Sequence, residues 1–223
     1  MSLSHWFVVT SLRGLTNLIC RIDDAQLAGV PEQGPLIIVT NHVNILEVPI
    51  IYTHLLPRTI HGMVLADRWK NPLLRWILNT TGTIPLYRGQ PNPDAMRLAI
   101  NFLKAGCFLI MMPEGTRSHD GCLQPAFTGV VLLALRSGAP ILPVGFYGAE
   151  HYKENLSRLR RTDFHLVVGK RFYLDNKGEA LSSQVRQQMT SEIMYHLAAI
   201  LPPAYRGVYS DLTQATQDYL VFP

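Results

Sequence analysis

Short apolar runs recur along the chain and alternate with helical patterns. The first strong run, Leu36–Thr40, is rich in β-branched residues and apolar on both faces, which is typical of a buried parallel strand. Similar runs follow at residues 62–66, 83–87, 108–112, 141–146 and 164–168. Strands that alternate with helices predict an α/β fold, here a single domain with a mainly parallel, twisted sheet flanked by helices.

The first 20 residues have the pattern of an amphipathic helix. One narrow apolar stripe recurs at helical spacing and consists of Val8, Leu12, Leu15 and Ile19. Two arrangements fit this stripe: a helix packed on the core, or a helix lying in the plane of a membrane with Trp6 and Phe7 as aromatic anchors. We therefore expect an N-terminal helix over residues 1–20 and leave both alternatives open.

Three further helices are predicted from the residues at their ends. One begins at Asn92-Pro93-Asp94, where asparagine suits the N-cap and proline the first turn, and it stops at Gly106. Another covers residues 129–136 before Gly138, and the last covers residues 183–201 before two prolines. Since no repeat or linker divides the chain, we expect one main domain over residues 21–203. The sequence pattern predicts no role for the tail, residues 204–223.

Composition narrows the class of protein. Hydrophobic residues make up 48% of the chain and charged residues 16%, which fits a globular fold and argues against disorder. The net charge of +4 suits phosphate-bearing partners, anionic membrane surfaces or nucleic acid without choosing among them. The longest strictly apolar runs have six residues, whereas a membrane-spanning helix needs about 20. The sequence therefore predicts no transmembrane segment.

The cysteines and the N-terminal residues indicate the compartment. Cys20, Cys107 and Cys122 are odd in number, widely separated and without metal-binding spacing, so they form no disulfide framework and indicate a reducing compartment. The apolar stretch near the N-terminus is too short for a signal peptide and is followed by Arg13. We expect an intracellular protein.

A histidine and a carboxylate follow the first strong strand. His42 comes directly after this strand, at the edge where open parallel sheets bind ligands, and Glu47 comes five residues later. Pro49 suits a first helical turn, so a helix is predicted to begin near Glu47 or Val48, with His42 in the loop before it. The carboxylate can then reach back to the imidazole and orient it as a general base. Taken alone, the pair also fits a loop histidine held for structural reasons.

A second polar block follows the run 108–112 and reads Pro113-Glu114-Gly115-Thr116-Arg117-Ser118. Its glycine allows close backbone approach, its hydroxyls can bind polar groups, and the arginine offers a planar fork suited to phosphate. Arg88 likewise follows the run 83–87. Downstream, residues 139–144 form an apolar strand bounded by Pro140 and Pro143, for which a structural role is the default.

Four such blocks in this order resemble the glycerolipid acyltransferase family, typified by 1-acylglycerol-3-phosphate acyltransferases. The blocks of that family are Asn-His-x4-Asp, Gly-x5-Arg, Pro-Glu-Gly-Thr-Arg-Ser and a proline-bounded apolar strand. They correspond here to residues 41–47, 82–88, 113–118 and 139–144. The motifs span residues 35–144, the layout extends to about residue 171, and the third block is highly specific.

The resemblance implies a role for each block. His42 would be the general base that removes a proton from an acceptor hydroxyl, and Glu47 would hold its imidazole. The phosphate–glycerol part of the acceptor would be bound by Arg88, Glu114, Gly115, Thr116 and Arg117. The acyl-donor side would be lined by Pro140, Ile141, Leu142 and Pro143. No metal or cofactor is implied, and the scattered His151, His165 and His196 are not expected to be ligands.

Two positions depart from the family pattern. Position 47 is Glu where the family usually has Asp, which moves the carboxylate by about 1.5 Å unless the backbone compensates. Family members often have a lysine between the first two blocks, shortly before the segment that is residues 67–71 here; Asp67 stands nearby, and Arg68 or Lys70 would replace the basic function. The acceptor could therefore differ from lysophosphatidic acid.

The resemblance predicts an enzyme of phospholipid biosynthesis that transfers a fatty acyl group from acyl-CoA or acyl-carrier protein to a lysophospholipid. The acceptor expected first is 1-acylglycerol-3-phosphate, and the alternatives are lyso-ornithine lipid, another hydroxyl lipid, or lipid binding without catalysis. A thioesterase-like hydrolase is less favoured because no Gly-x-Ser-x-Gly element is present. We expect a peripheral protein on the cytoplasmic face of a membrane, with no nucleic-acid partner. Four basic residues would either aid its membrane binding or belong to an ordinary solvated loop: Lys153, Arg158, Arg160 and Arg161.

Overall fold

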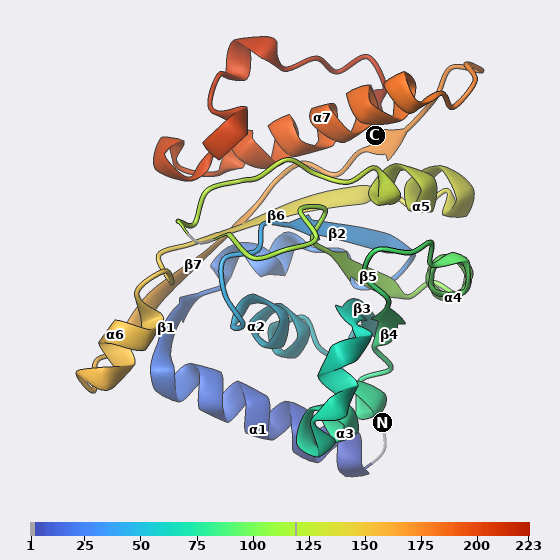
Figure 1. Ribbon diagram of the computed structural model, residues 1–223. Helices are drawn as coiled ribbons and strands as arrows, with labels where there is room; N and C mark the ends of the chain where they lie inside the picture. The colour runs from blue at the N-terminus through green and yellow to red at the C-terminus, as the bar shows by residue number, and fades with distance from the viewer. Residues whose placement is uncertain (1–2, 119) are drawn as a thin grey trace.

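A mixed sheet runs through the middle of the computed structural model, which describes residues 3–118 and 120–223 (Figure 1). Within these residues its seven strands have the order β1-β7-β6-β2-β5-β3-β4, and neighbours are parallel except for β6 and β7. The strands are β1 (Cys20–Asp23), β2 (Leu36–Thr40), β3 (Ile60–Leu65), β4 (Ile84–Leu86), β5 (Phe108–Met111), β6 (Ile141–Tyr147) and β7 (Thr162–Val168). The predicted strands are confirmed to within a few residues.

Helices cover both faces of the sheet. Alternate residues of β2 supply the two cores, because Ile37 and Val39 pack into one apolar cluster while Leu36 and Ile38 pack into the other. The first cluster is covered by α4 (Pro93–Lys104), α5 (Gly129–Ser137) and α7 (Ser183–Ile200), and the second by α1 (Leu3–Ile19) and α2 (Glu47–His54). Figure 1 shows α5 and α7 on one side of the sheet and α1 and α2 on the other. The predicted single α/β domain is confirmed.

Two helices were not predicted from the sequence. The first, α3 (Pro72–Thr80), buries none of its residues and is defined at its start by Asn71, whose side chain accepts a hydrogen bond from the Leu74 amide at 3.0 Å. The second, α6 (Tyr152–Ser157), also buries none. The described chain further contains the short 3-10 helices η1 (Ala25–Gly29), η2 (Ala66–Lys70), η3 (Pro203–Tyr205), η4 (Gly207–Tyr209) and η5 (Leu212–Gln214).

The N-terminal helix is present, but its buried face differs from the predicted stripe. Val8, Val9 and Thr16 are buried, whereas Leu15 is 55% exposed. The prediction was wrong at Leu15 because the helix is rotated so that Val9 and Thr16 also lie on its inner face, and Val9 joins the core beside α2. None of the described helices is both long enough and apolar enough to cross a membrane.

Residues after α7 pack back onto the domain. Tyr209, Tyr219 and Leu220 belong to the core, and β9 (Leu220–Val221) pairs antiparallel with β8 (Tyr173–Leu174). Glu192 of α7 is buried, and its carboxylate accepts hydrogen bonds from the Thr216 hydroxyl and from the amides of Asp218 and Tyr219. The tail, for which the sequence pattern predicted no role, is thus held to the domain by the buried Glu192 and by aromatic packing.

Candidate active site

Loops from neighbouring parallel strands meet at one edge of the sheet. The order β2-β5-β3-β4 is parallel throughout, so the carboxyl ends of these strands share that edge. The loop after β2 contains His42, the loop after β5 contains Glu114, and the segment after β4 contains Arg88. Residues far apart in the sequence are thereby brought to the same side of the molecule.

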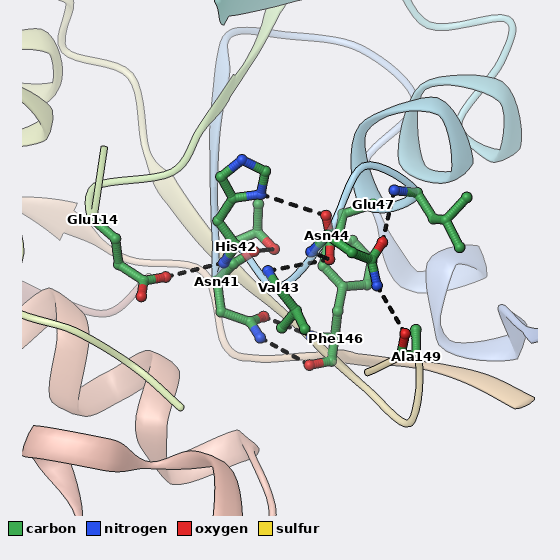
Figure 2. A network of polar contacts seen from close by, with 10 residues as sticks. Asn41, His42, Val43, Asn44, Glu47, Glu114, Phe146 and Ala149 are labelled. Atoms are coloured by element: carbon green, nitrogen blue, oxygen red, sulfur yellow. Dashed lines mark hydrogen bonds and ion pairs between the residues drawn. The ribbon is translucent and has the colours of Figure 1, made fainter. Parts of the chain in front are cut away.

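His42 and Glu47 form the centre of the site. Nδ1 of His42 lies 3.4 Å from Glu47 Oε2, and the carboxylate is only 1% exposed while the imidazole is 21% exposed (Figure 2). The distance exceeds the usual N–H···O range of about 2.7–3.2 Å, as is common for catalytic hydrogen bonds before substrate binds. A carboxylate at Nδ1 favours the proton on that nitrogen, which leaves Nε2, directed away from Glu47, as the basic atom.

The Glu47 carboxylate also organises the loop that contains His42. Its Oε1 accepts hydrogen bonds from the amides of Val43, at 3.2 Å, and Asn44, at 2.6 Å. Glu47 begins α2, as predicted, and Pro49 lies in the first turn, where its missing N–H would have had no partner within the helix. One side chain at the helix start therefore folds the preceding loop and faces the imidazole.

Two asparagines fasten this loop to β6 and to the segment that follows it. The Asn41 amide pairs with the backbone of Phe146 in both directions, donating to its carbonyl and accepting from its N–H, each at 2.8 Å. The Asn44 amide donates to the Ala149 carbonyl at 3.0 Å and accepts from the Leu46 N–H at 2.7 Å (Figure 2). The positioning role of Asn44 was missed by the sequence analysis, although paired asparagines flanking His42 were a visible signal.

Glu114 joins the loops after β2 and β5. It is 2% exposed, and its two oxygens accept hydrogen bonds from the His42 N–H at 3.0 Å and the Gln124 N–H at 2.9 Å. Burial raises the pKa of this carboxyl to about 7, against the opposing effect of the two N–H donors. This geometry indicates that Glu114 positions the backbone of His42. The predicted contact of Glu114 with substrate stays a prediction.

The rest of the block turns outward at Gly115. This glycine has φ +65°, and a Cβ there would lie 2.9 Å from the Phe127 ring, so both backbone and space require glycine. Gly115 and Thr116 are exposed, and Arg117 is partly exposed. These residues are available to a ligand at the sheet edge.

The comparisons with known proteins identify the family. A family model described as "Acyltransferase" matches residues 21–147, which is more than half of the chain. The chain belongs to the acyltransferase family. This finding confirms the resemblance carried by the four sequence blocks, which all lie within the matched residues. His42 and Glu47 of this acyltransferase both lie within the residues that the family model matches.

Named relatives of this acyltransferase extend over most of the chain. It is 26% identical to a chloroplastic 1-acyl-sn-glycerol-3-phosphate acyltransferase of Brassica napus over 84% of this chain and 52% of the relative. A 1-acyl-sn-glycerol-3-phosphate acyltransferase of Bacillus subtilis is 25% identical over 73% of this chain and 76% of the relative. A lyso-ornithine lipid O-acyltransferase of Pseudomonas aeruginosa is 28% identical over 54% of this chain and 46% of the relative. The chain spans about half the length of the chloroplastic relative.

The fold of this acyltransferase is also found in a solved structure. The 1-acyl-sn-glycerophosphate acyltransferase of Thermotoga maritima superposes with a TM-score of 0.62 at 22% identity, covering 88% of this chain and 80% of that chain. This likeness establishes a shared architecture, which agrees with the α/β fold predicted from the sequence.

The remaining predicted residues lie apart from His42. Arg88 lines a cavity of about 530 Å³ at the ends of β3 and β4, and neither His42 nor residues 114–117 are among the lining residues. Residues 140–143 are buried where β6 lies between β2 and β7, so they contribute to the core, and their donor-side role stays a prediction. Over residues 3–118 and 120–223, no group of three His, Cys, Asp or Glu side chains could hold a metal ion.

Proposed function

We propose that this acyltransferase moves a fatty acyl group from a thioester to the hydroxyl of a lysolipid, as part of phospholipid biosynthesis. The observation that carries the proposal is the pair formed by the buried Glu47 and the partly exposed His42, at the carboxyl edge of the parallel strands whose neighbouring ends also hold the cavity with Arg88. Membership of the acyltransferase family and the names of the relatives support it. The donor would be acyl-CoA or acyl-carrier protein.

In the proposed reaction, His42 acts first as base and then as acid. Nε2 takes the proton of the acceptor hydroxyl while the oxygen attacks the thioester carbonyl. The tetrahedral intermediate then collapses, the carbon–sulfur bond breaks, and the leaving thiolate receives the proton from the imidazolium. Glu47 stabilises that imidazolium through Nδ1 and keeps the ring oriented.

The acceptor would be one of the lysolipids that the relatives' names contain, 1-acylglycerol-3-phosphate or lyso-ornithine lipid. Arg88 supplies a guanidinium suited to the anionic group that both lipids carry. A protein that binds such lipids without catalysis is the rival function, and it would not depend on His42.

We further propose that α1 and α3 rest on the cytoplasmic face of a membrane. Trp6, Phe7 and Leu18 are exposed on α1, and Leu73 and Trp76 are exposed on α3. The rings of Phe7 and Trp76 lie 6.4 Å apart, which makes the two helices one apolar surface. A peripheral arrangement would give the site access to an acceptor whose acyl chain lies in the bilayer.

Two of the four basic residues expected to aid membrane binding have partners within the chain. Arg158 pairs with Glu154 at 2.9 Å, and Arg161 donates to the carbonyls of Asn17 and Cys20 at the end of α1. Because these two arginines already have partners, Lys153 and Arg160 are the better candidates for contacts with anionic lipid.

Acyl transfer can be tested with purified protein, a long-chain acyl-CoA and detergent-dispersed lysolipid, following thiol release and lipid product together. His42→Ala is expected to lower acceptor-dependent product by roughly 10²–10⁴-fold, the usual contribution of a general base. The matched control is His151→Ala, because His151 is an exposed histidine 3.7 Å from Glu154 and should leave the rate unchanged. Thiol release without acceptor would indicate hydrolysis, and a product rate independent of His42 would contradict the proposal.

A further inference from the structure

The cavity at the ends of β3 and β4 brings opposite charges together. Its volume is about 530 Å³, and the charged side chains among its described lining residues are those of Asp67, Lys70 and Arg88. Asp67 and Lys70 come from η2, whereas Arg88 follows β4. A site for a doubly charged anion alone would be expected to contain cations without a carboxylate, because a like charge nearby opposes binding.

Lys70 does not act as an unpaired cation in this cavity. Its Nζ lies 2.7 Å from Asp67 Oδ1. The hydrogen bond from Lys70 holds the pKa of Asp67 below its usual value, and the charges of Lys70, Arg68 and Arg88 act in the same direction. Asp67 is therefore an anion at neutral pH. Its ion pair with Lys70 involves Oδ1 and is open to solvent, with the Asp67 side chain 75% and the Lys70 side chain 82% exposed, so Oδ2 stays accessible to a cationic group of a ligand. Arg88 is the cation of the cavity outside this ion pair.

The two walls of the cavity are held in place by side-chain hydrogen bonds. Asn92 accepts from the Tyr87 N–H at 2.7 Å and donates to the Tyr87 carbonyl at 2.9 Å, which fixes the segment that leads to Arg88. Trp69 of η2 donates to Asn79 at 2.8 Å. Trp69 and Tyr87 also line the cavity, and aromatic faces attract cations.

We propose that this cavity binds the headgroup of the acceptor lipid and that Asp67 selects a headgroup with one anion and one ammonium. Arg88 pairs with the anion, while Asp67 and the aromatic rings receive the ammonium. A phosphate monoester carries about −1.5 to −2 charge at neutral pH and meets Asp67 with repulsion. This inference rests on the proposed acyl transfer, and it deepens that function by naming the acceptor class.

Two lipid classes have the required chemistry, and a transfer assay separates them. Lyso-ornithine lipid has a carboxylate and an ammonium, whereas lysophosphatidylethanolamine has a phosphodiester and an ammonium. We expect at least one of them to give a kcat/KM tenfold or more above that of 1-acylglycerol-3-phosphate. Lysophosphatidylglycerol, which has the phosphodiester without the ammonium, is the matched lipid control and should be a poor acceptor.

Asp67→Asn keeps the shape of the side chain and removes its charge. It should lower kcat/KM for the preferred zwitterionic lipid about tenfold and raise it for 1-acylglycerol-3-phosphate. The control variant is Asp94→Asn, because Asp94 forms an exposed pair with Arg97 at 2.8 Å, as Asp67 does with Lys70, but lies outside this cavity. It should leave the acceptor preference unchanged.

Failure of the inference is distinguishable from failure of acyl transfer. Equal or better use of 1-acylglycerol-3-phosphate by the unaltered protein, or an equal effect of Asp67→Asn on all acceptors, would overturn the inference while transfer itself stands. If no lipid is acylated, calorimetric titration with short-chain forms of the same lipids still measures headgroup preference without thioester. Binding that does not distinguish lysophosphatidylethanolamine from lysophosphatidylglycerol, and is unaltered by Asp67→Asn, would also overturn it.

Discussion

At the scale of single residues, the extra methylene of Glu47 has a use. A glutamate at the first position of α2 can offer one oxygen to the amides of Val43 and Asn44 and turn the other toward His42. The carboxylate of an aspartate lies closer to the helix backbone and would reach the same partners only if the loop moved. The departure from the usual family residue is thus matched by the local loop geometry.

Substitution of Glu47 by glutamine tests this double role. The amide oxygen of Gln can still accept from the loop amides, but its NH₂ would face Nδ1 and favour the wrong histidine tautomer. Glu47→Gln should therefore lower kcat by about 10³–10⁴-fold, by analogy with other base–orienter pairs, and change KM little. Steady-state kinetics measure this, with thermal unfolding to show that the fold is kept. Near-normal kcat would show that Glu47 does not orient the base.

At the scale of secondary-structure elements, the site depends on how the loop after β2 is tied to its neighbours. Glu114 ties it to the loop after β5, and Asn41 ties it to β6. His42 is therefore positioned by strands on both sides of β2. A carboxyl shared between two loops also makes their connection sensitive to pH.

The raised pKa of Glu114 predicts the direction in which the stability of the protein changes with pH. The unfolded chain ionises this group near its ordinary pKa of 4.5, whereas the folded protein does so only near 7. Between these values the unfolded chain binds fewer protons, so the contribution of Glu114 to stability falls as pH rises. The wild type should lose roughly 3 kcal/mol more than Glu114→Gln between pH 4.5 and 7.5.

Urea unfolding at several pH values measures this difference. Glu32→Gln is the control, because Glu32 is an exposed glutamate, and its curve should follow that of the wild type. Parallel curves for the wild type and Glu114→Gln would contradict the prediction.

The elements also show what the sequence could and could not predict. The start of α2 was predictable because Pro49 and Glu47 mark a first turn locally, and β2 was predictable because both of its faces are buried. The helix α3 was missed, although Leu73, Trp76 and Ile77 follow helical spacing, because it is short and none of its residues reaches the core. The partners of Asn44 and Glu114 lie 105 and 72 residues away in the chain, and no local pattern contains such pairings.

At the scale of the whole molecule, the apolar surface of α1 and α3 lies on the side away from α7 and the tail (Figure 1). Trp6 and Phe7 are each 57% exposed, and Trp76 is 42% exposed. The sequence indicated Trp6 and Phe7 as anchors but could not show that α3 continues the surface, because the contact between the helices is tertiary.

Removal of the aromatic side chains from this surface tests the membrane proposal. The double variant Trp6→Ser/Trp76→Ser should sediment at least tenfold less with vesicles that contain anionic lipid, since each side chain loses apolar area to bury. Val208→Ser is the control, because Val208 is exposed at 58% on the tail. Its vesicle binding should equal that of the wild type. Undiminished sedimentation of the double variant would contradict a membrane role for this surface.

The pairing of β1 with β7 has a consequence for the order of events during synthesis. Cys20 pairs with Thr162, so the strand that follows α1 has no partner until most of the chain has been made. At about 5–20 residues per second, α1 waits on the order of ten seconds before its edge of the sheet can form. In the proposed membrane arrangement, a bilayer would compete with α2 for the helix during this interval. The nascent protein would then be tethered to lipid before its catalytic domain is complete.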